Sequence, residues 1–135
     1  MSELATVLFV CVHNAGRSQM AAGYLKHLAG DQVKVLSAGT QPGTDINPMA
    51  RAVMLEEGID LSTAKPEKLS DEKVLESDYV ITMGCGDACP YFPGKTYLDW
   101  PLTDPKDQPI EVVRGIRDDI KAKVEELIEK IRASA

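Results

Sequence analysis

The fold of this chain is decided by the segment Val7-Leu8-Phe9-Val10-Cys11-Val12-His13-Asn14-Ala15-Gly16-Arg17-Ser18. Its first part is an unbroken apolar run, which predicts a strand over 6–11 that is buried on both faces. From about Ser18 to Leu28 the apolar residues recur every three or four positions, as in an amphipathic helix. The residues between these two elements therefore form a tight strand–loop–helix junction.

The residue types of this loop are those of an oxyanion-binding site built around a thiolate. Cys11 is followed six positions later by Arg17 and then by Ser18. Amides that turn inward at a helix N-terminus favour negative charge, and the same field favours the thiolate form of Cys11. The forked guanidinium of Arg17 suits two oxygens of a phosphate-like group. The amides predicted to bind the oxyanion are those of Arg17 and of the five residues before it, Val12, His13, Asn14, Ala15 and Gly16.

The alternative interpretation is a buried cysteine that merely ends a core strand, with the arginine in solvent. The position between a strand and a helix, together with Gly16 and Ser18, favours thiolate attack on a bound oxyanion instead. Asn14 tolerates positive φ and bonds local backbone, so we expect it to brace the loop together with Ser18. We also expect the Ser18 hydroxyl to donate to the Cys11 thiolate and the side chain of His13 to face outward.

Length and composition fit one soluble domain over residues 1–135. The chain is 44% hydrophobic and 27% charged, which is ordinary for a globular protein, and no apolar stretch approaches the ~20 residues of a membrane span. The N-terminal residues lack the basic start and long apolar region of a secretory signal. Three cysteines, an odd number without framework spacing, indicate a reducing cytoplasm. The net charge of −6 disfavours nucleic acid and anionic membranes as partners.

Strand and helix patterns alternate along the chain, which predicts an α/β domain with a parallel sheet. The expected strands cover 6–11, 33–36, 79–83 and 96–98. Asn47 and Pro48 are typical of a helix start, and Gly58 would end that helix after Glu57. Ser70 would cap a further, short helix. The clearest element is a C-terminal helix whose apolar stripe predicts a core-facing side; the stripe consists of Val113, Ile116, Ile120, Val124, Leu127 and Ile131.

One edge of the predicted sheet collects the residues that could carry chemistry. Ligands of open parallel sheets bind at the carboxyl ends of the strands, where the Cys11 loop and the segment 99–105 would both open. Asp104 could protonate the oxygen that leaves when the thiolate attacks, which makes it the candidate general acid. The alternative is that Asp104 only starts a turn, because Asp-Pro pairs often do so.

Cys85 and Cys89 follow the third predicted strand. They are buried small side chains, half of a zinc site, or redox partners of Cys11. A structural zinc site usually needs four ligands, and the remaining cysteine and the two histidines lie far away in the sequence, so no metal site is predicted. In the redox interpretation one of the two thiols attacks Cys11 and forms a disulfide. Redox and bystander roles both stay open.

Three separated motifs resemble the low-molecular-weight protein tyrosine phosphatase fold: CVHNAGRSQMA at 11–21, SAGT at 37–40 and TDP at 103–105. Within that fold the chain is most similar to the arsenate reductases. Gln19 stands where the phosphatases typically carry Pro, and paired cysteines follow the third strand. The resemblance implies a Rossmann-like, three-layer sandwich in which helices flank a central four-stranded parallel sheet.

The resemblance also implies roles for individual residues. Arsenate would be the substrate, and Cys11 would be the nucleophile, held together with arsenate by the loop amides and by Arg17. Asp104 would be the general acid for the departing oxygen. A second thiol would then attack Cys11, release arsenite and leave a disulfide, so the two electrons come from thiols and no bound cofactor is needed.

Two departures from the thioredoxin-coupled members bear on the reductant. Cys85 and Cys89 stand closer together than the later cysteines of those members, and a glutamate that holds a potassium ion in some of them falls at Ala22. The resemblance to a related branch implies an external small thiol, mycothiol before glutathione, with a mycoredoxin- or glutaredoxin-like protein completing the cycle. The thioredoxin system with an internal disulfide relay is the second expectation.

Two other functions would use the same loop. A phosphotyrosine phosphatase needs Cys11, Arg17 and Asp104 but no further thiol, so arsenite release with added thiol systems separates it from a reductase. A phosphocarrier would take a phosphoryl group on Cys11 and pass it on. Arg17 and Asp104 argue against a carrier, because they would promote turnover of the covalent intermediate.

Overall fold

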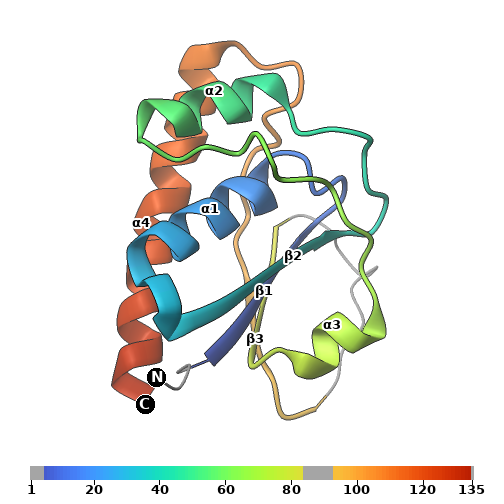
Figure 1. Ribbon diagram of the computed structural model, residues 1–135, viewed down its shortest axis with the longest axis vertical. Coiled ribbons are helices and arrows are strands. Elements are labelled where there is room, and N and C mark those ends of the chain that lie inside the picture. The colour runs from blue at the N-terminus through green and yellow to red at the C-terminus, as the bar shows by residue number, and fades with distance from the viewer. Residues whose placement is uncertain (1–4, 84–92, 135) are drawn as a thin grey trace.

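A computed structural model describes residues 5–83 and 93–134 of the chain. Four parallel strands form one sheet in the order β2-β1-β3-β4 (Figure 1). Their bounds are Ala5–Cys11 for β1, Val33–Gly39 for β2, Tyr79–Thr82 for β3 and Thr96–Asp99 for β4. The prediction of an α/β fold with a parallel sheet is confirmed.

Helices cover both faces of this sheet. Figure 1 shows α1, α2 and α4 on one side and the short α3 on the other, which gives the three layers implied by the family resemblance. The helices are α1 (Arg17–Ala29), α2 (Pro48–Glu56), α3 (Asp71–Glu76) and α4 (Ile110–Ser134), and a single turn of 3-10 helix, η1, spans Gly30–Gln32.

The central strand β1 is buried on both faces, as its apolar sequence predicts. Val7 and Phe9 pack into the larger core beneath α1, α2 and α4, whereas Leu8 and Val10 pack into a smaller core with Val74 of α3. Side chains alternate along a strand, so Cys11 follows Phe9 onto the face covered by α1. The nucleophile candidate thus sits where the strand meets the start of that helix.

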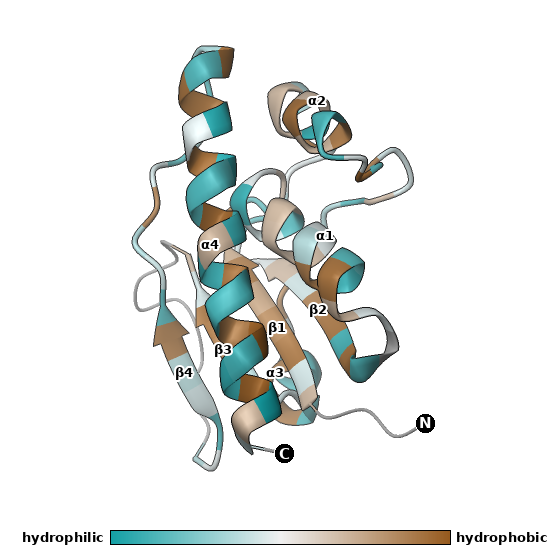
Figure 2. Ribbon diagram, turned by 90° about the vertical axis from the view of Figure 1, so that its left-hand side faces the viewer, coloured by the Kyte–Doolittle hydropathy of each residue, from teal (hydrophilic) through white to brown (hydrophobic). Residues whose placement is uncertain are grey.

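The long helix α4 lies along α1 on the face of the sheet (Figure 2). The six residues of the predicted apolar stripe are all at most 6% exposed, which confirms the core-facing side. Figure 2 also shows that β1 is brown over most of its length, while the edge strand β4 is paler and more polar. The most hydrophobic strand is therefore the one that carries the loop at Cys11.

Capping residues set the ends of the shorter helices. The Asn47 side chain accepts hydrogen bonds from the N–H groups of Met49 and Ala50, and Pro48 opens α2; the Ser70 hydroxyl likewise accepts from the Lys73 N–H at the start of α3. The helix α2 ends at Glu56, one residue before the predicted end, because the chain turns there into Gly58 with a φ of +78°.

The strand β2 extends three residues beyond its predicted end at Leu36. Its last residues pair with the carboxyl end of β1, in the register Phe9–Ser37, Val10–Ala38 and Cys11–Gly39. The chain leaves β1 toward β2 on one side and reaches β3 on the other, which makes the end of β1 a topological switch point. The loop after Cys11 opens at this point.

Candidate active site

The loop 12–16 presents its amides to a concave interior because all its carbonyl groups are held from outside. Each carbonyl oxygen from Cys11 to Ala15 accepts a hydrogen bond, at 2.8–3.2 Å. In a trans peptide the C=O and the next N–H point in opposite directions, so the N–H groups of 12–16 point to the inner side. The donors are the backbone amides of Thr40, Gln41, Gly43 and Asn47 and the side chain of Gln19.

Gly39 allows β2 to approach this loop closely. A Cβ at Gly39 would lie 2.6 Å from the carbonyl oxygen of Val12 and 2.9 Å from the amide nitrogen of Asn14, which leaves no room for any side chain. Asn14 itself adopts a positive φ of 51°, the conformation that asparagine tolerates better than most residues. The loop shape therefore depends on the residue types at both positions.

The Cys11 sulfur lies inside the loop, within hydrogen-bond distance of two polar groups. Its Sγ is 3.1 Å from the Asn14 amide nitrogen, which donates to it, and 2.9 Å from Ser18 Oγ. Cys11 is only 2% exposed, and Ser18 is fully buried. The expected contact between the Ser18 hydroxyl and the sulfur is present in the structure.

Arg17 opens α1, and its guanidinium points back toward the segment after β4. Its Nη1 donates to the carbonyl oxygen of Leu102 at 3.0 Å, and its Nη2 lies 3.7 Å from Asp104 Oδ2. The guanidinium has five N–H donors, more than these two contacts use. Arg17 is 7% exposed, so its charge is held at the loop and not in bulk solvent.

Asp104 makes the turn contact that the sequence predicted and also lies beside Arg17. Its Oδ1 accepts a hydrogen bond from the Lys106 amide at 3.0 Å, as expected of an aspartate that starts a turn. Its Oδ2 faces Arg17 at the edge of the site, and the side chain is 47% exposed. The turn holds the carboxylate beside the oxyanion loop while leaving it open to exchange protons with solvent.

A cleft of about 600 Å³ leads to the sulfur. Cys11, Arg17 and Asp104 line it together with residues 43–49 and 105–108. This volume is typical of a pocket for a small organic ligand and is far more than one oxyanion needs. His13 also lines the cleft.

Part of the predicted chemistry involves residues that the structure does not describe. Cys85 and Cys89, the redox candidates, lie outside the described residues. Within 5–83 and 93–134, no three histidine, cysteine or acidic side chains are placed to hold a metal ion. Ala22 is buried and carries only a methyl group, so its side chain offers no ligand oxygen to a cation. In the same ranges, no helix is long and apolar enough to cross a membrane.

Two features of the site were not predicted from the sequence. The first is Gln19, whose side chain contacts both the backbone and the side chain of Asn14. The second is the segment 40–47, whose amides hold the carbonyl groups of the loop. The S-A-G-T motif that ends β2 is the sequence signal that could have indicated the second feature, because Gly39 marks the close approach.

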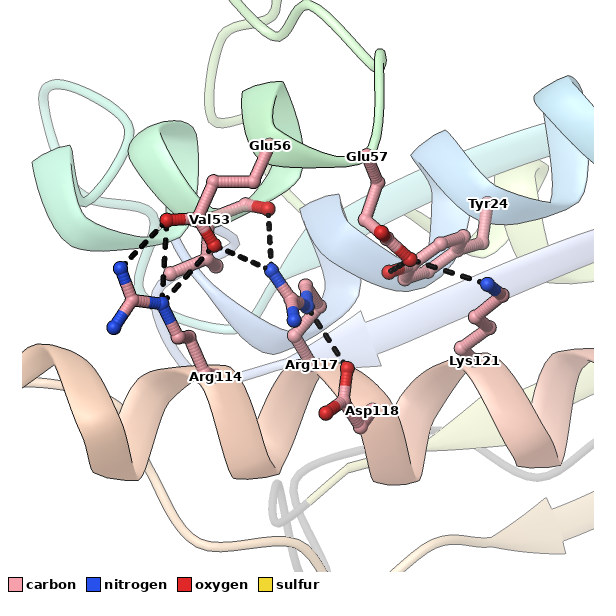
Figure 3. A network of polar contacts seen from close by, with 8 residues as sticks. All are labelled: Tyr24, Val53, Glu56, Glu57, Arg114, Arg117, Asp118 and Lys121. Carbon is pink, nitrogen blue, oxygen red and sulfur yellow. Dashed lines mark hydrogen bonds and ion pairs between the residues drawn. The ribbon is translucent and has the colours of Figure 1, made fainter.

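A polar network ties α1 to α2 and α4 behind the site (Figure 3). The Tyr24 hydroxyl donates to Glu57 at 3.2 Å, and Lys121 Nζ lies 3.1 Å from the same oxygen. Burial, followed by the charge of Glu57, raises the pKa of Tyr24. Beside this cluster, hydrogen bonds from Arg114 and then from Arg117 lower the pKa of the Glu56 carboxyl to about 2. The network joins α1, the helix that Arg17 begins, to Glu57 after α2 and to Lys121 of α4.

The chain is similar to known proteins in both sequence and structure. The family model described as low molecular weight phosphotyrosine protein phosphatase matches residues 6–135. The glutaredoxin arsenate reductase of Synechocystis sp. is 38% identical over 128 residues, which are 93% of this chain and 97% of that protein.

Two solved structures are similar over nearly the whole chain. The thioredoxin-dependent arsenate reductase of Corynebacterium glutamicum superposes with a TM-score of 0.88 at 46% identity, covering 99% of this chain and 65% of that one. The YwlE arginine phosphatase of Geobacillus stearothermophilus superposes with a TM-score of 0.84 at 28% identity, covering 96% of this chain and 94% of that one.

Proposed function

This chain belongs to the low molecular weight phosphotyrosine protein phosphatase family, and within that family we propose that it is an arsenate reductase. The observation that carries the proposal is the meeting of four elements in one cleft: the Cys11 sulfur, the inward amides, Arg17 and Asp104. Relatives named arsenate reductases match most of the chain, among them two that are 38% and 35% identical over 93% of it and one that is 46% identical over 99% of it. Both lines of support point to a four-oxygen anion attacked by a thiolate.

The first step forms a bond between Cys11 Sγ and arsenic. The amides of 12–16 and the Arg17 guanidinium hold the arsenate oxygens and stabilise their negative charge. As the sulfur attacks, the bond from arsenic to a hydroxyl group of the arsenate breaks, and Asp104 gives its proton to that hydroxyl, which leaves as water. The Ser18 hydroxyl, whose Oγ lies 2.9 Å from the sulfur, holds it in place before the attack.

The second step reduces arsenic. A second thiolate attacks Cys11 Sγ, an S–S bond forms, and the S–As bond breaks with its electron pair left on arsenic. Arsenic thus passes from the +5 to the +3 state and leaves as arsenite, while two thiols are oxidised to one disulfide. No bound cofactor takes part in either step.

We propose that the second thiol is an external low-molecular-weight thiol, with mycothiol favoured over glutathione and a mycoredoxin- or glutaredoxin-like protein as the partner that reduces the mixed disulfide. Cys11 is almost fully buried, and the cleft of about 600 Å³ leaves room beside the oxyanion for a small thiol. One relative is named a glutaredoxin arsenate reductase. Another is named thioredoxin-dependent, and a thioredoxin system acting through Cys85 or Cys89 is the second candidate. Chemistry that consumes thiols belongs in a reducing cytoplasm.

Arsenite release separates the candidate reductants. The purified chain is incubated with arsenate and, side by side, with mycothiol and mycoredoxin, glutathione and glutaredoxin, or thioredoxin and its reductase. Cys85→Ser and Cys89→Ser should both keep their activity with the mycothiol system. Loss of activity in either variant with every donor would favour the internal relay, and no arsenite with any donor would contradict the reductase assignment.

Phosphatase activity is the second candidate, because the matching family model is described as a phosphotyrosine phosphatase and one similar structure is named an arginine phosphatase. Such an activity would use Cys11, Arg17 and Asp104 but no further thiol. Hydrolysis of an aryl phosphate and of phosphoarginine, compared with arsenite release from the same preparation, tests this candidate. Efficient ester hydrolysis without thiol-dependent arsenite release would make the phosphatase the better assignment.

A further inference from the structure

We infer that Gln19 is a positioning residue for Cys11: its side-chain amide holds Asn14 so that Asn14 directs the hydroxyl proton of Ser18 onto the sulfur. The inference rests on Cys11 being the nucleophile of the proposed function. It does not depend on arsenate being the substrate, because each contact lies within the protein.

Gln19 lies in the first turn of α1 and is 4% exposed. Its Nε2 lies 3.1 Å from each of three oxygens, namely the carbonyl oxygen of Asn14, the side-chain oxygen of Asn14 and the carbonyl oxygen of Lys65. Backbone carbonyl oxygens can only accept hydrogen bonds. The group that faces them must therefore be the amino end of the Gln19 amide, which fixes its orientation.

The orientation of the Asn14 amide is fixed in the same way. The backbone N–H of Glu67, which can only donate, lies 2.8 Å from Asn14 Oδ1. The amino end of Asn14 therefore faces Ser18 and donates to its Oγ at 2.6 Å. Neither buried amide is free to rotate by half a turn without placing two donors or two acceptors against each other.

This chain of contacts leaves one place for the hydroxyl proton of Ser18. The hydroxyl has a single hydrogen, and its oxygen already accepts from Asn14, so the hydrogen is available for Cys11 Sγ at 2.9 Å. All four side chains are at most 4% exposed, so water does not compete for these contacts. The direction of donation thus runs from Gln19 through Asn14 and Ser18 to the sulfur.

Gln19 is needed to keep these hydrogen bonds in place because Asn14 adopts a left-handed backbone conformation, with a φ of 51°. Gln19 binds both the carbonyl oxygen and the side-chain oxygen of this residue. Without the amide of Gln19 the Asn14 carbonyl loses its partner, and its peptide group can rotate. Ser18 then loses its donor from Asn14, and its hydroxyl proton is no longer directed to Cys11.

The test uses the alkylation rate of Cys11, which needs no arsenate turnover. Cys85→Ser and Cys89→Ser are combined so that Cys11 is the remaining thiol of the three. In this background Gln19→Met, which keeps the length of the side chain but removes its donor, should lower the rate with iodoacetamide at neutral pH by about tenfold, as expected when one hydrogen bond toward a charged group is lost. Gln32→Met, at an exposed position just before β2 begins, at the end of that strand away from the loop, should leave the rate unchanged.

A double-mutant cycle distinguishes action through Ser18 from a general loosening of the loop. Ser18→Ala alone should lower the alkylation rate, and adding Gln19→Met should then lower it no further. An unchanged rate for Gln19→Met alone, or an equal drop with and without Ser18, would overturn the inference. Circular dichroism and thermal melting show whether each variant folds. If Gln19→Met folds poorly, Gln19→Glu provides the measurement instead, because its carboxylate has the same size but opposes the three acceptor oxygens. Failure of arsenite release with the cycle intact would refute only the proposed function.

Discussion

The Asp104 carboxylate lies 3.7 Å from the guanidinium of Arg17, although one residue follows the last strand and the other begins the first helix. The distance brings a carboxyl group to the guanidinium that would hold the oxygens of a bound oxyanion. Asp104 is half exposed while Arg17 is buried, so a proton can reach the carboxylate from solvent without disturbing the guanidinium.

Asp104→Asn tests the role of this carboxylate. The amide keeps the turn contact with the Lys106 amide but cannot protonate the departing oxygen, so the rate of arsenite release should fall by about 10²–10⁴-fold. Asp107→Asn is the matched control, because Asp107 lines the same cleft and its positive φ of 60° suits asparagine. An unchanged rate in Asp104→Asn would show that Asp104 serves only to form the turn.

Cys11→Ser should abolish arsenite release and leave the fold intact. The serine hydroxyl fills the same buried space, but it is a far weaker nucleophile and cannot form a disulfide. Activity is measured with the best reductant, and folding is checked by circular dichroism and by binding of inorganic phosphate. Turnover that survives the substitution would remove Cys11 from the mechanism.

Gly39→Ala should distort the oxyanion loop, although Gly39 belongs to β2 and not to the loop itself. The added methyl would lie 2.6 Å from a backbone oxygen of the loop, and overpacking of this kind typically costs about 1–3 kcal/mol. We expect a lower melting temperature and weaker binding of phosphate measured by calorimetry. The matched control is Gly43→Ala, where the nearest atoms are 3.9 Å away. Equal behaviour of the two variants would contradict the role assigned to Gly39.

Glu56→Gln tests the network behind the site through pH. Hydrogen bonds from Arg114 and Arg117 lower the pKa of Glu56 to about 2 from an ordinary value of 4.5. The folded state therefore gains stability from the charged form above pH 4.5, and this gain is lost as pH falls toward 2. Urea unfolding should show Glu56→Gln less stable than the parent protein at pH 7.

The difference between the two proteins should shrink as the pH falls from 4.5 toward 2. The exposed Glu125, substituted by Gln, serves as the control and should show neither effect. A difference in stability that is constant with pH would mean that packing, and not the charge of Glu56, carries the contribution.

Local sequence patterns predicted the sheet class, the buried strand β1 and the core-facing side of α4. These features follow from hydrophobic periodicity, which acts within one element. The end of β2 was missed because Ser37, Ala38 and Gly39 have little strand propensity of their own. They belong to the strand β2 only because they pair with the last residues of β1.

The site was predictable where its residues are neighbours in sequence, as Cys11, Arg17 and Ser18 are. The contacts of Gln19 with Lys65, and of the loop with the segment 40–47, join parts of the chain that no local pattern connects. Tertiary contacts decide these features, and periodicity does not encode them.

The outward bonds of the loop carbonyls have a consequence for how quickly an anion is captured. Because every oxygen from Cys11 to Ala15 already has its partner, the peptide groups are aimed before any substrate arrives. An incoming anion meets a preorganised ring of donors and loses little free energy to reordering the protein. Capture should therefore be limited by diffusion into the cleft and by shedding of the hydration shell of the anion, with no slow rearrangement of the backbone preceding it.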